Sequence, residues 1–304
     1  MKFIKKLKIF LRNMQFLFFS TPDQIKLKNL TNHNFHKSVI IFTHHKCAST
    51  FINKLILKIK KKEKFIKAVN WSNLISAYGH YINFTQHYKS LTPKWSTKKI
   101  DSYESFFEKN SHEMFNQFNH IYGPIRNCFS LGFSNKFKKI IFVRNPLDTL
   151  VSAYYSFGHS HKTSNDKVQG DKSTKEKKYF QKIKIDKFAL DLSKEWLKPL
   201  LNSYMKICQT NPDDTIVITY EDLIKNPKKE IRKMLQFASI DSTNKNLDYL
   251  LKDEVFTQIN VKINSHQRNG RIKQYTRELS KKTINKINII LNKENKFFWS
   301  NLKF

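Results

Sequence analysis

The chain has 304 residues, 39% of them apolar, so it is long enough for one large domain or two small ones. Lys and Arg outnumber Asp and Glu by 56 to 24, which indicates nucleic acid, an anionic membrane surface or an acidic small molecule as partner, although a general richness in Lys, Asn, Ile and Phe produces such an excess as well. The three cysteines include no CxxC pair, which argues against a disulfide framework or a zinc site and indicates a reducing, cytoplasmic compartment.

Residues 1–30 are expected to form a basic amphipathic helix or extension that precedes the folded domain. The run MKFIKKLKIFLRNMQFLFFS is interrupted by Arg12 and Asn13, so it falls short of the roughly 20 apolar residues of a membrane span. It also lacks the small-residue cleavage site of a signal peptide. We expect a helix that packs on the protein, and the alternative is a helix that contacts a membrane surface through its basic face.

Residues 31–304 predict a single domain of the α/β class with a mostly parallel central sheet. Four short apolar runs are typical of buried strands, and KIIFV and TIVIT are apolar on both faces, as central parallel strands are. Segments with apolar residues at helical spacing alternate with these runs, which predicts helices that flank the sheet. The strands are expected at 38–43, 119–122, 139–143 and 215–219, and the helices at 51–59, 148–157, 188–208 and 228–237.

The segment 159–184 differs from its surroundings because it is polar, rich in lysine and without a hydrophobic period. Little apolar burial can hold such a segment in one place, so it predicts a mobile insertion over a binding site. The alternative is a solvated insertion that contacts no substrate.

The stretch FTHHKCAST, residues 42–50, joins an expected strand to an expected helix. Ligands of open parallel sheets bind beyond the carboxyl ends of the strands, and a helix that begins near Ser49 directs unpaired N–H groups at this position. Small residues and Lys46 therefore predict a phosphate-binding loop, with an ordinary N-capped helix as the alternative. The loop lacks the glycines of an NTPase loop, and Asn53 stands where a cysteine phosphatase would need an arginine, so Cys47 is expected to be a small loop residue.

Two blocks resemble the donor-binding motifs of sulfotransferases that use 3′-phosphoadenylyl sulfate (PAPS). THHKCASTF, residues 43–51, is similar to the loop that holds the 5′-phosphosulfate in that family. IIFVRNPLDTLVSAYYSF, residues 140–157, is similar to its 3′-phosphate motif, in which Arg144 and Ser152 take the two binding positions. The resemblance implies a P-loop-like three-layer fold, PAPS as donor and no metal ion.

Two later blocks agree with this family less specifically. TIVITYEDL, from residue 215, resembles the strand and helix that carry a residue next to the adenine, here Tyr220, which a core tyrosine would equally explain. RNGRIKQY, from residue 268, resembles the Arg-x-Gly loop over the 3′-phosphate but has Lys273 near the place of a second glycine and Tyr275 where a tryptophan is common. The implied donor site comprises Lys46, Cys47, Ala48, Ser49, Thr50, Phe51, Arg144, Ser152, Tyr220, Arg268, Asn269 and Gly270.

The resemblance also implies two catalytic residues, Lys46 and a histidine base. The family's base follows the second strand, and the corresponding region NHIYGPIRN offers His120. Tyr122 fits the spacing as well, and His44 and His45 beside Lys46 are further alternatives, as are an acidic residue or no essential base.

The expected function is transfer of a sulfuryl group from PAPS to a hydroxyl or amine of a small-molecule or glycan acceptor. Sugars, lipid headgroups, phenols and peptide tyrosines all remain open as acceptors. A P-loop-type ATP-dependent kinase would need a glycine-lysine-hydroxyl end to the loop and an acidic magnesium ligand, neither of which the sequence offers. A nucleic-acid-binding protein would interleave aromatic residues with arginine, whereas the basic residues here are mostly lysine and spread along the chain.

Overall fold

The computed structural model describes residues 36–63, 66–70, 115–126, 130–160, 177–252 and 272–292. The expected N-terminal helix and the predicted donor residues Arg268, Asn269 and Gly270 lie outside the described residues. Residues 161–176 of the polar insertion also lie outside them, whereas residues 177–182 at its end are helical.

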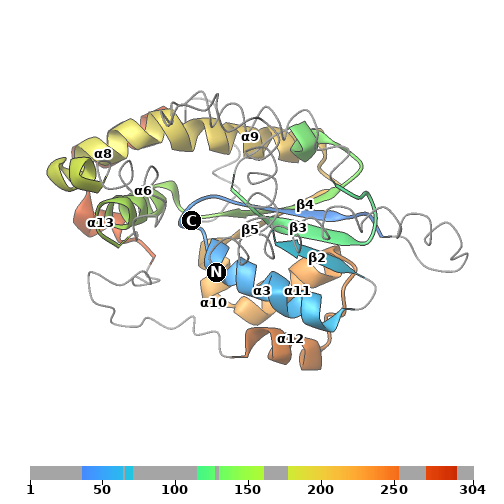
Figure 1. Cartoon of the computed structure of the whole chain (residues 1–304). Coiled ribbons are helices and arrows are strands. Elements are labelled where there is room, and N and C mark those ends of the chain that lie inside the picture. Colours follow the sequence, from blue (N-terminus) through green and yellow to red (C-terminus); the bar gives the residue numbers. More distant parts are fainter. Residues whose placement is uncertain are drawn as a thin grey trace, which may run out of the picture.

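A five-stranded parallel sheet forms the centre of the described structure, in the order β2-β3-β1-β4-β5 (Figure 1). The expected α/β class is therefore confirmed, and all four expected strands are present. The additional strand β2 was not expected, because KAVN is short and half polar. The strands are β1 Val39–Thr43, β2 Lys67–Asn70, β3 His120–Ile125, β4 Lys138–Val143 and β5 Thr215–Thr219.

Helices follow the strands as expected, with one interruption. The long helix expected at 188–208 is divided by a π-helical turn, η3 (Ser193–Leu197). A second π-helical turn, η2 (Ser156–Ser160), follows α6, and a short 3₁₀ helix, η1 (Ser130–Phe133), precedes β4. The α-helices are α3 Ser49–Lys62, α6 Pro146–Tyr155, α8 Ile185–Leu192, α9 Lys198–Thr210, α10 Tyr220–Lys225, α11 Pro227–Phe237, α12 Asn244–Leu251, α13 Tyr275–Glu278 and α14 Lys281–Asn292.

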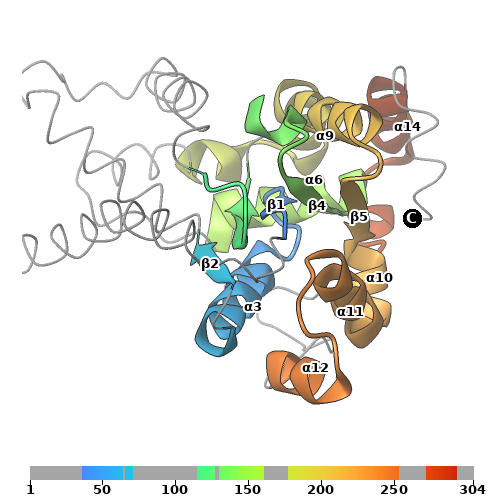
Figure 2. The ribbon, with the colours of Figure 1, turned by 90° about the vertical axis from the view of Figure 1, so that its right-hand side faces the viewer.

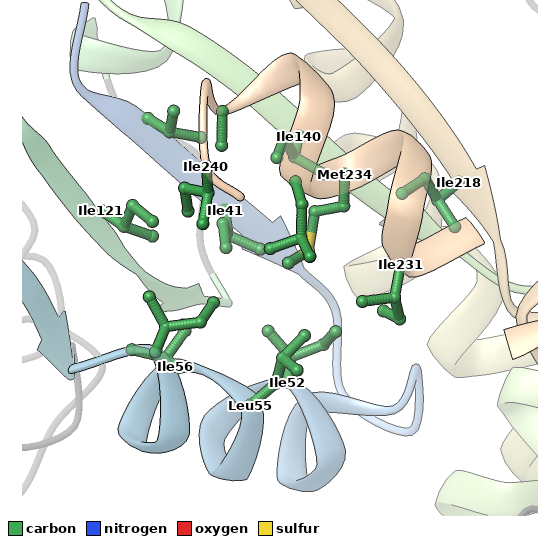
Figure 3. Packing of buried hydrophobic residues seen from close by; sticks show 14 of the residues in the cluster. Ile41, Ile52, Leu55, Ile56, Ile121, Ile140, Ile218, Ile231, Met234 and Ile240 are labelled. Atoms are coloured by element: carbon green, nitrogen blue, oxygen red, sulfur yellow. The ribbon is translucent and has the colours of Figure 1, made fainter. Parts of the chain in front are cut away.

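The two faces of the sheet pack against separate hydrophobic cores, because successive strand residues point to opposite faces. Ile40 and Phe42 face the core beneath α6, α9 and α14, which lie together on one side (Figures 1 and 2). Val39 and Ile41 face the other core, where α3 and α11 cover the sheet. Figure 3 shows apolar side chains of both helices meeting the strand residues in this second core. The fold thus has three layers, as expected.

The sequence places a capping residue at the start of several helices. Asn145 accepts hydrogen bonds from the backbone N–H groups of Leu147 and Asp148, and Pro146 follows it at the first helical position of α6. Asn226 caps α11 in the same way. Among the described helices, none is long and apolar enough to cross a bilayer.

Candidate functional site

The loop between β1 and α3 occupies the carboxyl edge of the sheet. Lys46 and Ala48 adopt left-handed backbone conformations, with φ of 68° and 53°, and the N–H of Cys47 donates to the carbonyl of His44 (3.2 Å). Ala48 stands at the N-cap of α3 and supplies no side-chain hydrogen bond, and the first turn contains no acidic residue. The first N–H groups of α3 therefore have no side-chain cap, which leaves a positive helix end suited to an anion.

The other predicted residues of this loop differ in exposure. Ser49 is buried at the first position of α3, Thr50 is exposed and Phe51 is half-buried. Cys47 is fully buried, and this burial raises the pKa of its thiol well above the usual value. The thiol is neutral at physiological pH, so Cys47 is placed as a small packing residue of the loop and not as a nucleophile.

His44 is a neutral, buried side chain that connects two backbone segments by hydrogen bonds, and it is not placed as a base. The backbone N–H of Arg144 donates to its Nε2 (3.2 Å), so Nδ1 carries the ring proton and donates to the carbonyl of His45 (2.9 Å). Burial of the ring lowers its pKa to about 4. His44 thus joins the loop after β1 to the end of β4, and both of its nitrogens are occupied.

Arg144 brings the ends of three strands together. It follows β4, and its Nη1 donates to the carbonyl of Lys46 in the loop after β1 (3.0 Å). Its guanidinium carbon lies 4.3 Å from the ring centroid of Tyr220, which follows β5. Arg144 and Tyr220 are only 5% and 8% exposed, so both side chains of this contact are almost completely buried. Three of the predicted donor residues therefore meet at one edge of the sheet.

Glu221, which was not predicted from the sequence, contacts the turn that follows Arg144. Its Oε1 accepts a hydrogen bond from the backbone N–H of Asn145 (3.0 Å), and the side chain is 5% exposed. Burial raises the pKa of this carboxyl, and backbone hydrogen bonds, chiefly from Asn145, and then the positive charge of Arg144 oppose that effect. Glu221 thus holds the turn that carries Arg144 and offsets part of the arginine charge.

Asp148 is a second buried acid that was not predicted. The side chain is 1% exposed, and its two oxygens accept from the backbone N–H groups of Lys273 (2.6 Å) and Tyr275 (3.1 Å). Asp148 lies in the first turn of α6, so this helix fixes the chain a few residues after the predicted Arg-x-Gly stretch. At the other end of α6, the hydroxyl of Tyr155 donates to Glu278 (2.6 Å). Ser152 is half-buried on the same helix.

The structure does not bring His120 to this edge. His120 is the first residue of β3 and pairs with the first residue of β2, and its backbone N–H donates to Ser38, which precedes β1. Since β3 has six residues at about 3.3 Å each, His120 lies roughly 15 Å along the strand from the carboxyl edge. Its ring is stacked on Tyr122, whose buried hydroxyl accepts from the backbone N–H of Asn116 (2.9 Å). Both residues stabilise the amino end of β3, so neither is a candidate for the base.

His45 is the histidine that the structure places beside Lys46. The ring is half-buried, and it lies edge-on to Phe157 of η2 and Trp196 of η3, with centroid distances of 6.1 Å to each. These two π-helical turns therefore bring aromatic side chains over the loop. From the sequence, His45 was only an alternative to His120 as the base.

Arg126 is a third cationic residue at this edge. It follows β3 directly, and its Nη2 donates to the hydroxyl of Ser49 (3.4 Å). The residue is exposed at the surface, and partial desolvation of its guanidinium lowers the pKa of this group. The sequence offered one signal for it, an arginine after an apolar strand, as for Arg144. Within the described ranges, no group of three or more His, Cys, Asp or Glu side chains could hold a metal ion.

Comparisons with known proteins concern the family and the fold of the chain. The sulfotransferase domain model matches residues 36–296, whereas no curated protein matches the chain in sequence. The structure is similar to that of the mouse sulfotransferase SULT7A1 complexed with PAP, with a TM-score of 0.53 and 13% identity over 88% of this chain and 86% of that one. It is also similar to a retinol dehydratase in a complex with retinol and PAP, with a TM-score of 0.47 and 11% identity over 86% and 81%. At these identities the likeness concerns the fold.

Proposed function

Because the chain belongs to the sulfotransferase family, we propose that it transfers a sulfuryl group from PAPS to a hydroxyl or amine of a small-molecule or glycan acceptor. The observation that carries this proposal is the convergence of Lys46, Arg144 and Tyr220 from three strand ends beside the uncapped start of α3. A donor with two separate phosphates and an adenine needs such a divided site.

The order of the strands orients the donor. The loop after β1 lies between Arg144, which follows β4, and the β3 side of the sheet. We infer that Arg144 and Ser152 bind the 3′-phosphate and that Tyr220 lies beside the adenine. The N–H groups of residues 48–51 bind the 5′-phosphate, as helix N-termini commonly do for phosphates, whereas the N–H of Cys47 donates to the carbonyl of His44.

The proposed chemistry is mostly positioning and charge stabilisation. The acceptor oxygen forms a bond to sulfur while the bond from sulfur to the 5′-phosphate oxygen breaks, and that oxygen keeps the electron pair. Lys46 neutralises the charge that develops on this leaving oxygen. We propose His45, in place of His120, as the residue that takes the acceptor proton, because it is adjacent to Lys46 and belongs to the same edge.

The aromatic side chains beside His45 indicate which class of acceptor fits the site. Phe157 and Trp196 bracket the histidine ring, so an acceptor whose hydroxyl approaches His45 meets aromatic surface as well. We therefore favour an acceptor with a ring that can stack on these residues, such as a sugar or a phenol.

The experiment is a transfer assay with PAPS and a panel of sugars and phenols, in the presence of a metal chelator. Formation of PAP is measured for the wild type, for Lys46→Ala and for Lys54→Ala, which removes the same charge from the exposed face of α3. Loss of Lys46 should lower turnover about 100-fold or more, by analogy with removal of an oxyanion donor, and should weaken PAP binding much less. Wild-type turnover in Lys46→Ala at saturating PAPS would contradict the catalytic role.

A further inference from the structure

The two residues to which we assign the chemistry, His45 and Lys46, form the centre of a tight turn. The N–H of Cys47 donates to the carbonyl of His44 (3.2 Å), which closes a four-residue β-turn around them. Lys46 has a positive φ of 68°, whereas the φ of His45 is not positive. A positive φ at the third residue alone is characteristic of a type II turn, which usually has glycine there. The conformation of this turn therefore decides where both side chains point.

The side chain of His44 holds the peptide that distinguishes this turn from the more common type I. The two types differ in the orientation of the peptide between the second and third residues, here His45 and Lys46. Nδ1 of His44 donates to the carbonyl of that peptide (2.9 Å), and a reversed peptide would direct this carbonyl away. The left-handed conformation of Lys46 is unfavourable for a residue with a side chain, so this hydrogen bond offsets a local strain.

The other ring nitrogen of His44 connects the turn to the proposed site of the 3′-phosphate. Its Nε2 accepts from the backbone N–H of Arg144 (3.2 Å), the residue directly after β4. Arg144 also donates through its Nη1 to the carbonyl of Lys46 (3.0 Å). The ring of His44 is 0% exposed and lies edge-on to Trp196, so packing restricts its rotation. One buried side chain thus contacts both the arginine of the donor site and the turn that carries the reacting groups.

We propose that His44 is a positioning residue for the transfer reaction, an inference that rests on the proposed function. Its bond to the carbonyl of His45 selects the turn that presents His45 and Lys46 to the transferred group. Its bond from Arg144 fixes the arginine, and with it the 3′-phosphate, relative to this turn. Because the two bonds use different nitrogens, the first supports turnover and the second supports recognition of the 3′-phosphate.

Two substitutions separate these bonds. The amide of asparagine lies about as far from the backbone as Nδ1, so His44→Asn keeps a donor for the carbonyl of His45 and loses the bond from Arg144. The amide of glutamine reaches the position of Nε2, so His44→Gln keeps an acceptor for Arg144 and loses the other bond. The control His120→Gln makes the same change at the amino end of β3.

Calorimetry with PAP and adenosine 5′-monophosphate measures the recognition of the 3′-phosphate and the fraction of protein that is folded and competent to bind. His44→Asn should lower the preference for PAP about tenfold, the effect of one lost hydrogen bond, and His44→Gln and the control less than about threefold.

Formation of PAP from saturating PAPS, with an accepted sugar or phenol or with water as acceptor, measures turnover per binding-competent site. His44→Gln should lower this turnover about tenfold or more, because small displacements of catalytic groups slow a reaction steeply. His44→Asn should lower it less than about threefold.

Two results would overturn the inference and leave the proposed function standing. In the first, both His44 variants keep the preference for PAP and the turnover of the wild type. In the second, both variants lose preference and turnover to the same extent, which would make His44 a packing residue of the loop. A wild type that does not prefer PAP, or that forms no PAP from PAPS, would overturn the proposed function itself and the inference with it.

Discussion

Replacement of Lys139 by methionine should stabilise the protein, and the gain should disappear at high pH. Lys139 is the second residue of β4, at the edge of the sheet opposite the proposed site. Its side chain is 0% exposed, and its ammonium has no hydrogen-bond partner among the described residues. The neighbouring Asp214 forms an ion pair with Lys37, with 2.7 Å between its Oδ2 and the lysine Nζ. Methionine has a similar length and no charge to desolvate.

The pKa of Lys139 sets the size of the expected change in the free energy of unfolding. Burial lowers this pKa from 10.5 to about 8, so the unfolded chain binds more protons than the folded one between these two values. Stability of the wild type therefore rises with pH across that window. A shift from 10.5 to about 8 corresponds to an upper limit of about 3 kcal/mol of destabilisation at pH 7. At pH 10.5 the same relation leaves less than about 0.5 kcal/mol.

Urea unfolding of the wild type and Lys139→Met at pH 7 and pH 10.5 measures this effect. Lys139→Met should be more stable at pH 7, and the difference should nearly vanish at the higher pH. Lys136→Met, which removes a charge from the exposed turn before β4, should stay within about 0.5 kcal/mol of the wild type at both. A stability difference that is the same at both pH values would refute the reasoning, because it would not come from protonation of Lys139.

Further predictions concern the site. Asp148→Asn should weaken PAP binding about tenfold and should change the binding of adenosine 5′-monophosphate little. The reason is that an amide keeps only one of the two hydrogen bonds that fix residues 273–275 near the proposed site of the 3′-phosphate. An equal loss of affinity for both nucleotides would assign Asp148 to general stability. His45→Ala should lower turnover with PAPS about 100-fold or more, the typical contribution of a general base. His120→Gln should keep turnover within about threefold, since this side chain lies at the amino end of β3; turnover assays that show the reverse order would restore His120 as the base.

The strands and the loop after β1 could be predicted because their signals are local. β1 and β4 contain continuous apolar runs, as expected of strands covered on both faces, and the lysine with small residues lies directly after β1. The apolar run of β5 also predicted a central strand, which is wrong: β5 is the edge strand, and its first three residues are only half-buried. β2 has no such signal, because two of its four residues, Lys67 and Asn70, are polar.

The parts that could not be predicted depend on partners far away in the sequence. Glu221 contacts a backbone group 76 residues away, and Asp148 contacts groups 125 and 127 residues away. The ring of His44 is fixed by a backbone N–H that lies 100 residues away in the sequence. The sequence therefore could not distinguish this structural role from that of a base. His120 was assigned by its place in a motif, and the motif did not show at which end of β3 the residue stands.

The central claim is that Arg144 and Lys46 form a two-phosphate donor site. The measurement that tests it most directly is calorimetric binding of PAP and of adenosine 5′-monophosphate to the wild type and to Arg144→Met, without added metal ions. The two ligands differ only in the 3′-phosphate. We predict that the wild type binds PAP at micromolar or lower concentration and the monophosphate at least about tenfold more weakly, and that Arg144→Met removes most of this difference. Equal affinity of the wild type for both ligands, or an unchanged preference in Arg144→Met, would contradict the account.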